Sequence, residues 1–371
     1  MSAPRPRGET VAIVADLHLG VGDGDPFTED DRFAVTVGRL VADAVGRRFR
    51  LVLLGDTVDF PAVTLPGERV TPATEPAEAV AKLDRVLAAH PTVVQALRAV
   101  ITAGHQVEFV AGNHDMELVL PVVRERLRSA LGGGPDAVRV HPWVVFVPGV
   151  LYAEHGQQQH DVNRFPELGD GCVTSHGRLA VPVGSYMDAL VHLRRRQPGA
   201  STPVLVGQAL RMVAGIVTGL GRLSRAERRR IRSGHDVHDA LGSGLPREAL
   251  SSIDRASAAT PTSIARRAAA MAAARFRSSG AAPALPYMQS AGQAVHRVLE
   301  DQGCAVPFYV FGHTHVAADV PLGATGTARY LNPGTWSSMV RRVPGGERRF
   351  GVVVIEQESG VAPRAELRFS G

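Results

Sequence analysis

Cysteine is nearly absent from this sequence. Only Cys172 and Cys304 occur in 371 residues. Two cysteines are too few to stabilise a chain of this length through disulfide bonds, so an extracellular scaffold that depends on disulfides is excluded. The first nine residues are rich in proline and arginine and contain no apolar stretch, so they give no indication of a secretory signal. We therefore expect a reduced, cytoplasmic setting.

The sequence also lacks a segment that fits a membrane-spanning helix well. The most apolar candidate, residues 204–220, is interrupted by Gln208 and Arg211 and contains several glycines. Charged and strongly polar residues near the centre of a spanning helix are costly, so this segment fits a bilayer poorly. Arginine clusters flank it at residues 194–196 and 222–232, which leaves peripheral contact with an anionic membrane surface open.

Lysine is almost missing, so arginine carries the positive charge. Lys82 is the single lysine among 41 basic residues, and the net charge is +5. Residues 181–300 contain 17 arginines against 7 acidic residues, whereas the rest of the chain is net acidic. Aromatic residues are only 5% of the chain and are few in this segment. The positive charge leaves binding to nucleic acid open as an alternative, but the small number of aromatic residues does not favour a surface on which bases stack.

Five apolar segments of strand length each end at side chains that can bind a metal ion or move a proton. Such segments predict buried strands, and α/β folds usually place their chemistry on the loops that leave strand ends. We therefore expect the five ends to converge on one edge of a sheet. The segments are residues 10–15 before Asp16 and His18, 51–54 before Asp56 and Asp59, 107–111 before Asn113, His114 and Asp115, 149–153 before His155, and 307–311 before His313 and His315.

Together the five motifs resemble those of the calcineurin-like metallophosphoesterase family. In chain order they are Asp-x-His from Asp16, Gly-Asp-x-x-Asp around Asp56, Gly-Asn-His-Asp around Asn113, a single His before Gly at His155, and Gly-His-x-His around His313. The resemblance covers most of the chain. It implies an α/β fold of four αββα layers, in which two mixed sheets pack face to face between helices.

The resemblance also implies two metal sites that share one carboxylate. It assigns to one ion Asp16, His18 and His315, to the other Asn113, His155 and His313, and to the bridge between them Asp56. Two divalent cations favour phosphate ester hydrolysis because they lower the pKa of a bridging water and neutralise developing charge. Imidazole, carboxylate and amide oxygen suit Mn, Fe, Zn or Ni, with Mn expected in vitro, and disfavour Ca. His155 alone also fits a hydrogen-bonded structural histidine.

The remaining polar residues of the motifs receive supporting roles. His114 is not needed as a ligand, so we expect it to act as general acid or electrostatic partner of the leaving oxygen, oriented by Asp115. Asp59 is either a helix cap or a support for the ligands. His160, Asp161 and Asn163 form either a polar wall near the site or a solvated loop. Substrate binding is predicted for Asn113, His114, Asp161 and Asn163.

The strand patterns divide the chain into a catalytic core and an insertion. The core comprises residues 1–160 and 303–371, with helices expected over residues 30–45, 77–89, 92–103 and 116–130. The insertion, residues 161–302, has almost no strand pattern, and its expected helices are residues 187–196, 204–220, 225–232, 263–277 and 288–302. Apolar helices edged by arginine would form a lid over the substrate, rest on a membrane, or form a solvated cap.

These observations predict a dinuclear metal-dependent phosphoesterase. It would hydrolyse a phosphomonoester, phosphodiester or pyrophosphate by attack of a metal-bridging hydroxide, with His114 assisting the leaving group. Residues 16–19 and the helical insertion also look like the UDP-2,3-diacylglucosamine pyrophosphohydrolase branch, which implies a phosphorylated small-molecule or lipid-linked substrate. A nuclease or cyclic-nucleotide phosphodiesterase is an alternative. A non-enzymatic scaffold or membrane-surface protein that acts through the arginine-rich insertion is another.

Overall fold

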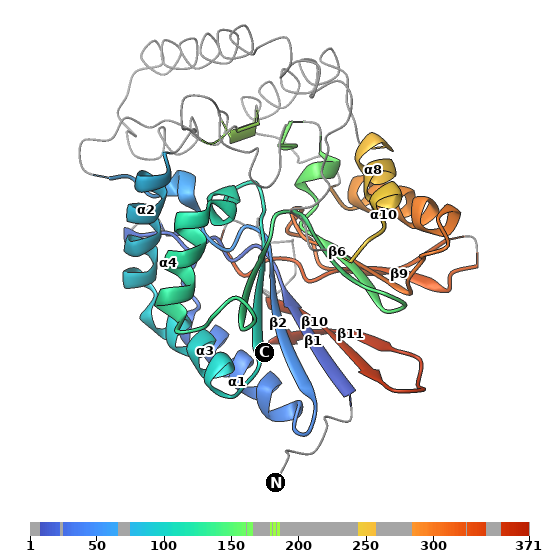
Figure 1. Ribbon diagram of the computed structural model, residues 1–371, viewed down its shortest axis with the longest axis horizontal. Helices are drawn as coiled ribbons and strands as arrows, with labels where there is room; N and C mark the ends of the chain where they lie inside the picture. Colours follow the sequence, from blue (N-terminus) through green and yellow to red (C-terminus); the bar gives the residue numbers. More distant parts are fainter. Residues whose placement is uncertain are drawn as a thin grey trace, which may run out of the picture.

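The computed structural model describes residues 8–22, 25–65, 75–160, 162–165, 179, 181–182, 184–185, 244–256, 284–323, 325–338 and 350–370. Two mixed β-sheets pack face to face, and helices cover their outer faces (Figure 1). The predicted sandwich of two mixed sheets between helices is confirmed. The helices expected at residues 187–196, 204–220, 225–232 and 263–277 lie outside the described residues.

The first sheet has six strands in the order β11-β10-β1-β2-β3-β4. Its parallel part consists of β1 (Gly8–Val14), β2 (Arg48–Leu54), β3 (Gln106–Val110) and β4 (Val138–His141). The antiparallel strands are β10 (Phe350–Glu358) and β11 (Arg364–Ser370). Because β1, β2 and β3 are parallel neighbours, the loops that leave their carboxyl ends begin side by side.

The second sheet has five strands in the order β5-β6-β7-β9-β8. Its parallel strands are β6 (Leu151–Glu154), β7 (Phe308–Phe311) and β9 (Ala328–Asn332). The antiparallel strands at its two edges are β5 (Val144–Val147) and β8 (Ala318–Leu322). The carboxyl ends of β6 and β7 are therefore adjacent as well.

Four helices cover the outer face of the first sheet (Figure 1). They are α1 (Asp30–Asp43), α2 (Pro76–Ala89), α3 (Pro91–Thr102) and α4 (Pro121–Leu131). The spacing of Phe33, Val37 and Leu40 places one apolar stripe of α1 against the sheet. These side chains join Leu51 and Leu53 of β2 in one buried cluster, which fixes the helices on the strands.

The single helix expected over residues 116–130 is wrong. Met116–Val119 forms a short 3₁₀ helix, and α4 begins only at Pro121. Leu120 has an extended backbone, with φ −65° and ψ 129°, because proline disfavours the α conformation in the residue before it. Pro121 starts α4, where its missing N–H leaves no hydrogen bond unmade.

Two helices cover the outer face of the second sheet, namely α8 (Arg247–Ala256) and α10 (Ala284–Asp301) (Figure 1). Leu299 of α10 and Ile253 of α8 pack against Tyr309 of β7 in a second buried cluster. The helix expected at residues 288–302 is confirmed and starts four residues earlier. Both helices fall in the range assigned to the insertion, yet they pack on the core sheet. Within the described residues, no helix is long and apolar enough to cross a membrane.

The space between the sheets is apolar near the carboxyl ends of the strands and charged near their amino ends. Val52 of β2 and Val310 of β7 belong to the buried cluster between the sheets. Strand alternation places Arg50 on the same side of β2 as Val52. The Arg50 guanidinium donates to both carboxylate oxygens of Glu108, at 2.8 and 2.9 Å, and His141 Nε2 lies 3.0 Å from Glu108 Oε2. The Glu108 side chain is fully buried.

Replacing Glu108 with Gln is expected to lower the free energy of unfolding at pH 7 by about 2–3 kcal/mol. Burial by itself would raise the pKa of Glu108, but the hydrogen bonds and charges of His141 and Arg50 lower it to about 2. A depressed folded pKa stabilises the protein above the ordinary pKa of 4.5, and this contribution is lost as the pH falls toward 2. Denaturant unfolding at pH 7, 5 and 3 measures it.

The difference between wild type and Glu108→Gln should stay constant from pH 7 to pH 5 and shrink at pH 3. Glu125→Gln is the matched control, because the Glu125 side chain is 67% exposed, and it should change stability little at any of these pH values. A Glu108→Gln effect that does not depend on pH would show that the loss comes from packing and not from the charge.

Candidate metal centre

All the predicted metal ligands lie on loops that leave the carboxyl ends of strands. Asp16 and His18 follow β1, Asp56 follows β2, Asn113 follows β3, His155 follows β6, and His313 and His315 follow β7. The expected convergence occurs, but on the adjoining edges of two sheets instead of one. Each sheet thus supplies one side of the site.

The first cluster consists of Asp16, His18 and His315. Asp16 Oδ1 lies 3.1 Å from His315 Nε2 and 4.0 Å from His18 Nε2, and the two imidazole Nε2 atoms are 3.2 Å apart. Asp16 and His18 are buried, and His315 is 22% exposed. One carboxylate and two imidazoles at this separation could hold one cation. These are the three residues that the motifs assign to one ion.

The second cluster consists of Asp56, His155 and His313, which could also hold a cation. Asp56 Oδ2 lies 3.2 Å from His155 Nε2 and 3.7 Å from His18 Nε2. This oxygen therefore faces both clusters, as a bridging carboxylate must. Asn113 Oδ1 is buried and makes no hydrogen bond in the described part of the chain. A buried amide oxygen without a donor is what the predicted role as a ligand requires.

His155 is held in one orientation by the backbone. Its Nδ1 lies 2.9 Å from the carbonyl oxygen of Leu54, so Nδ1 carries the proton and donates to that carbonyl. The other nitrogen, Nε2, faces Asp56 Oδ2 at 3.2 Å. His155 is thus both a hydrogen-bonded histidine of the sheet edge and a member of the second cluster, and the two interpretations of the sequence are compatible.

The backbone is strained at the candidate ligands. Among the described residues, five that are not glycine have a positive φ: Asp16 (56°), His18 (56°), Asp56 (50°), His313 (68°) and His315 (61°). All five are predicted ligands. The left-handed region costs about 1–3 kcal/mol for each such residue. Strain concentrated at one site in this way indicates a functional arrangement that the rest of the fold holds in place.

The surroundings of Asp56 and His313 favour the deprotonated forms that bind metals. Those of His155 favour its protonated form. Burial would raise the pKa of Asp56, but His155, His114 and His18 hold it well below its ordinary value. Burial and neighbouring imidazoles, His155 first, hold the pKa of His313 well below its ordinary value. Burial would also lower the pKa of His155, but Asp56 and Asp16 raise it to about 9. Loading the site with metal should therefore release a proton from His155.

Asp115 does not orient His114, so that prediction is wrong. Its carboxylate accepts backbone N–H groups from Gly112 at 2.6 Å, Thr57 at 2.7 Å and Asp56 at 3.2 Å. These bonds tie the loop after β3 to the loop after β2. Burial and the charge of Asp56 raise the pKa of Asp115 to about 7. Asp115 therefore supports the loops that carry the ligands, and its carboxylate does not contact the His114 imidazole.

Asp59 takes the position that was expected for Asp115. Its Oδ1 lies 3.0 Å from His114 Nδ1, and its Oδ2 lies 3.6 Å from His18 Nδ1. Asp59 Oδ1 also accepts the backbone N–H of Ala62 at 3.2 Å and so caps a 3₁₀ helix. The predicted role of Asp59 as a helix cap is confirmed, and its role as a support for the ligand His18 stays a prediction. A carboxylate behind a ligand imidazole fixes its tautomer and orientation.

The loop after His155 forms a polar wall beside the second cluster. His160 Nδ1 lies 3.1 Å and Asn163 Nδ2 3.2 Å from His313 Nε2, and the two are 3.1 Å from each other. The solvated-loop alternative is therefore wrong for these two residues. His160 is thus part of the polar wall that the sequence predicts, although no ligand, catalytic or substrate role was assigned to it. Asp161 lies outside the described residues.

Glycines of the motifs allow the loops to approach each other closely. A Cβ on Gly112 would lie 2.2 Å from Asp56 Oδ1 and 2.5 Å from its backbone nitrogen. A Cβ on Gly312 would lie 2.8 Å from Asp16 Oδ2, and a Cβ on Gly55 would lie 2.3 Å from Cγ of His155. Any side chain at these positions would displace a candidate ligand.

Gly55→Ala is expected to destabilise the protein by about 1–3 kcal/mol more than Gly104→Ala. Gly55 and Gly104 have nearly equal φ values of 78° and 80°, but a Cβ on Gly104 would meet nothing within 4 Å. The strain of a left-handed alanine is common to both variants, so their difference isolates the clash with His155. Thermal unfolding measures the stability difference, and a metal titration should show weaker binding for Gly55→Ala alone. Equal behaviour of the two variants would contradict the close packing at His155.

Comparisons with known proteins leave the family of this chain undecided. No family model matches the sequence, and no curated protein matches it. Among solved structures, the chain is similar to "Phosphopantetheinyl Hydrolase (PptH) from Mycobacterium tuberculosis", with 13% identity, a TM-score of 0.27 and coverage of 92% of this chain and 99% of that chain. A likeness at that TM-score supports no conclusion about fold or function. Membership of the calcineurin-like metallophosphoesterases thus stays a prediction from the motifs.

Proposed function

We propose that this protein is a metal-dependent hydrolase of phosphate esters or anhydrides that uses two divalent cations. The observation that carries the proposal is the pair of His and Asp clusters that share one carboxylate. Asp56 Oδ2 lies within 4 Å of imidazole nitrogens in both clusters. A single cation needs no such shared oxygen, whereas two-metal hydrolases are built around one.

The donor atoms fit transition-metal ions better than Mg²⁺ or Ca²⁺. Imidazole nitrogens outnumber carboxylates in the combined clusters, and this mix of nitrogen and oxygen donors suits Mn, Fe, Zn or Ni. One ion would be held by Asp16, His18 and His315, the other by Asn113, His155 and His313, with Asp56 between them. When bound, the two cations would neutralise charge on the phosphoryl oxygens and lower the pKa of a water.

His114 is placed to serve the leaving group. Its backbone N–H donates to Asp56 Oδ1 at 2.8 Å, which ties the residue to the bridging carboxylate. Its Nδ1 faces Asp59, and its side chain is 12% exposed. With Nδ1 occupied, Nε2 is the atom that would donate a proton to the oxygen that leaves. We therefore assign His114 as the general acid and Asp59 as the residue that positions it.

The substrate would meet polar side chains on the side of the second cluster. His160 and Asn163 lie beside that cluster, within 3.2 Å of His313 Nε2, and the buried Asn113 Oδ1 accepts no hydrogen bond within the described residues. Such groups suit a phosphoryl oxygen or a hydroxyl of the substrate. The proposal therefore keeps Asn113, His114 and Asn163 as substrate contacts and adds His160 to them.

Hydrolysis of bis-p-nitrophenyl phosphate tests the function. Protein treated with a chelator and then desalted should show no turnover, and Mn²⁺ should restore it, because the proposed reaction depends on the two cations to lower the pKa of a water and to neutralise the developing charge. p-Nitrophenyl phosphate, cyclic nucleotides, DNA and lipid pyrophosphates are compared in the same assay to find the preferred class. Turnover that persists in excess chelator, or no turnover of any compound with Mn, Fe, Zn or Ni, would contradict the proposal.

A further inference from the structure

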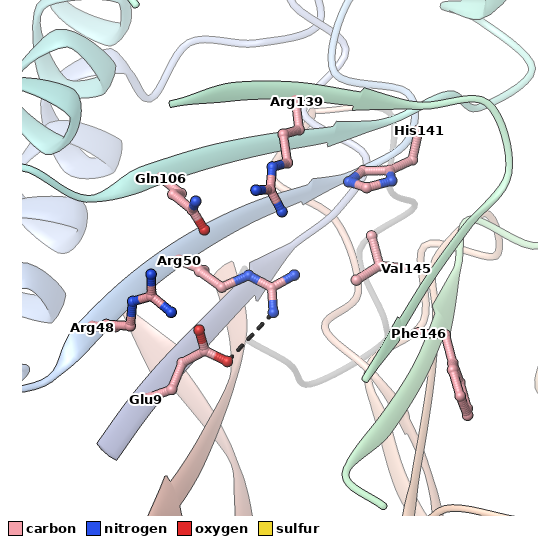
Figure 2. Close-up of a pocket in the computed structure, with 8 residues that line it drawn as sticks. All are labelled: Glu9, Arg48, Arg50, Gln106, Arg139, His141, Val145 and Phe146. Atoms are coloured by element: carbon pink, nitrogen blue, oxygen red, sulfur yellow. Dashed lines mark hydrogen bonds and ion pairs between the residues drawn. The ribbon is translucent and has the colours of Figure 1, made fainter. Parts of the chain in front are cut away.

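A cavity of about 230 Å³ opens between the sheets near the amino-terminal ends of β2, β3 and β4. Arg48, Arg50, Arg139 and His141 line it, together with Glu9 (Figure 2). The candidate ligands Asp56 and Asn113 follow the opposite, carboxyl-terminal ends of β2 and β3. Arg50 lies four residues, or about 13 Å of extended chain, before the end of β2 at Leu54, and Asp56 follows that end. The cavity is therefore separate from the metal centre.

The walls of this cavity carry an excess of positive charge. Three arginines face two carboxylates, those of Glu9 and the buried Glu108. Both carboxylates are paired with Arg50, whose Nη1 lies 3.4 Å from Glu9 Oε2. The negative charges near the cavity are thus already engaged by one guanidinium.

The other two guanidinium groups lack a close anionic partner. Arg48 makes no hydrogen bond or ion pair within the described residues. Arg139 approaches only Asp136, at 3.9 Å, and its own side chain is 43% exposed. Figure 2 shows the side chains of Arg48, Arg50 and Arg139 gathered around one space. One unpaired guanidinium group and one that is only loosely paired at the same cavity favour the binding of negative charge.

The buried acid behind the cavity distinguishes it from an ordinary solvated surface. Burying Glu108 without partners would be costly, and a surface cluster of arginines does not require a buried carboxylate. Here Glu108 grips both Arg50 and His141 from inside the sandwich. The Arg50 guanidinium and the His141 imidazole therefore have fixed orientations before any ligand binds. Binding sites are commonly positioned by hydrogen bonds of this kind to residues outside the cavity.

We propose that this cavity binds a small dianion of the phosphate type, held by Arg48 and Arg139 with Arg50 and His141 as fixed neighbours. The planar fork of arginine matches two oxygens of a tetrahedral anion. The volume lies below the range of about 300–1,000 Å³ that is common for drug-sized ligands, so the occupant is an inorganic anion or the phosphate end of a small metabolite. This site is independent of the proposed hydrolase function.

Residue-resolved modification by phenylglyoxal tests the proposal, with sulfate, inorganic phosphate and glycerol 3-phosphate as probes at constant ionic strength. The full chain is labelled and the rate at each arginine is read by mass spectrometry. Saturating anion should slow the labelling of Arg48 and Arg139 about tenfold, because the bound anion covers both guanidinium groups. Arg364 is the control, since it is exposed on β11 and lies outside the cavity. Its rate should not change.

Two variants separate this site from the metal centre. Asp56→Asn should show the same protection at Arg48 and Arg139, so that a failure of the hydrolase function leaves this result unaffected. Arg139→Ala should lose at least tenfold in affinity for the anion by calorimetry, whereas Arg364→Ala should lose none. If no probe protects Arg48 and Arg139, or if Arg364 is slowed equally, the cavity is not an anion site. Protection by glycerol 3-phosphate alone would identify the occupant as an organic phosphate.

Discussion

Replacing Asp56 with Asn is expected to lower phosphodiester turnover about a thousandfold or more and to remove bound divalent metal. Asp56 Oδ2 lies 3.7 Å from His18 Nε2 and 3.2 Å from His155 Nε2, so it is the carboxylate oxygen that serves both clusters. Asparagine keeps the shape and can still accept the His114 N–H that Asp56 Oδ1 accepts. The loop should therefore stay in place while the bridging charge is lost. Initial rates with Mn²⁺ and elemental analysis after desalting measure the two effects.

Asp84→Asn is the matched control for this variant. Asp84 is 43% exposed and pairs with Arg126 on the surface, so its replacement should change neither turnover nor metal content. Circular dichroism of both variants checks that the fold is kept. Turnover within tenfold of wild type for Asp56→Asn, with metal still bound, would show that this carboxylate does not bridge the clusters.

Replacing His114 with Ala is expected to lower turnover about 10²–10⁴-fold for substrates with alkyl leaving groups, while metal content stays unchanged. His114 is outside the set of seven predicted ligands, and its Nδ1 is engaged by Asp59. A general acid matters most when the leaving oxygen is a poor leaving group. The loss should therefore be smaller for p-nitrophenyl esters than for alkyl esters of phosphate. Rates with the two kinds of substrate, measured on the same preparation, provide the comparison.

His105→Ala is the control for this variant, because His105 lies in the loop before β3, at the end of the strand away from the site. It should leave both rates unchanged. Asp59→Asn should shift the rates in the same direction as His114→Ala but by less, since it removes only the group that positions the imidazole. An equal loss for good and poor leaving groups, or a loss of metal in His114→Ala, would contradict the role as general acid.

The strands and their functional ends were predictable because each is a local pattern. The run from Leu51 to Leu54 is apolar at every position, is buried at every position, and ends at Gly55 and Asp56 as the sequence indicates. Parallel pairing of β1, β2 and β3 then brings the ends together without further information. The same logic failed at residues 116–130, where the restriction that Pro121 places on Leu120 outweighed helical spacing.

The roles of individual acids were harder to predict than the ligands. Asp115 follows His114 directly in the sequence, but neighbouring residues on a loop rarely face each other. The partner of His114 is Asp59, 55 residues away, because the loops after β2 and β3 lie side by side. His160 likewise reaches His313 only through the turn that follows β6. Contacts of this kind depend on the path of two loops at once, and a single segment does not encode them.

The crystal structure of the protein soaked with Mn²⁺ tests the central claim most directly, because anomalous scattering locates each ion independently of the protein atoms. The account predicts two ions about 3.5–4 Å apart, with Asp56 bound to both, one ion contacting Asp16, His18 and His315, and the other contacting Asn113, His155 and His313. A single ion, ions bound elsewhere, or an Asp56 that contacts only one of them would contradict the dinuclear centre.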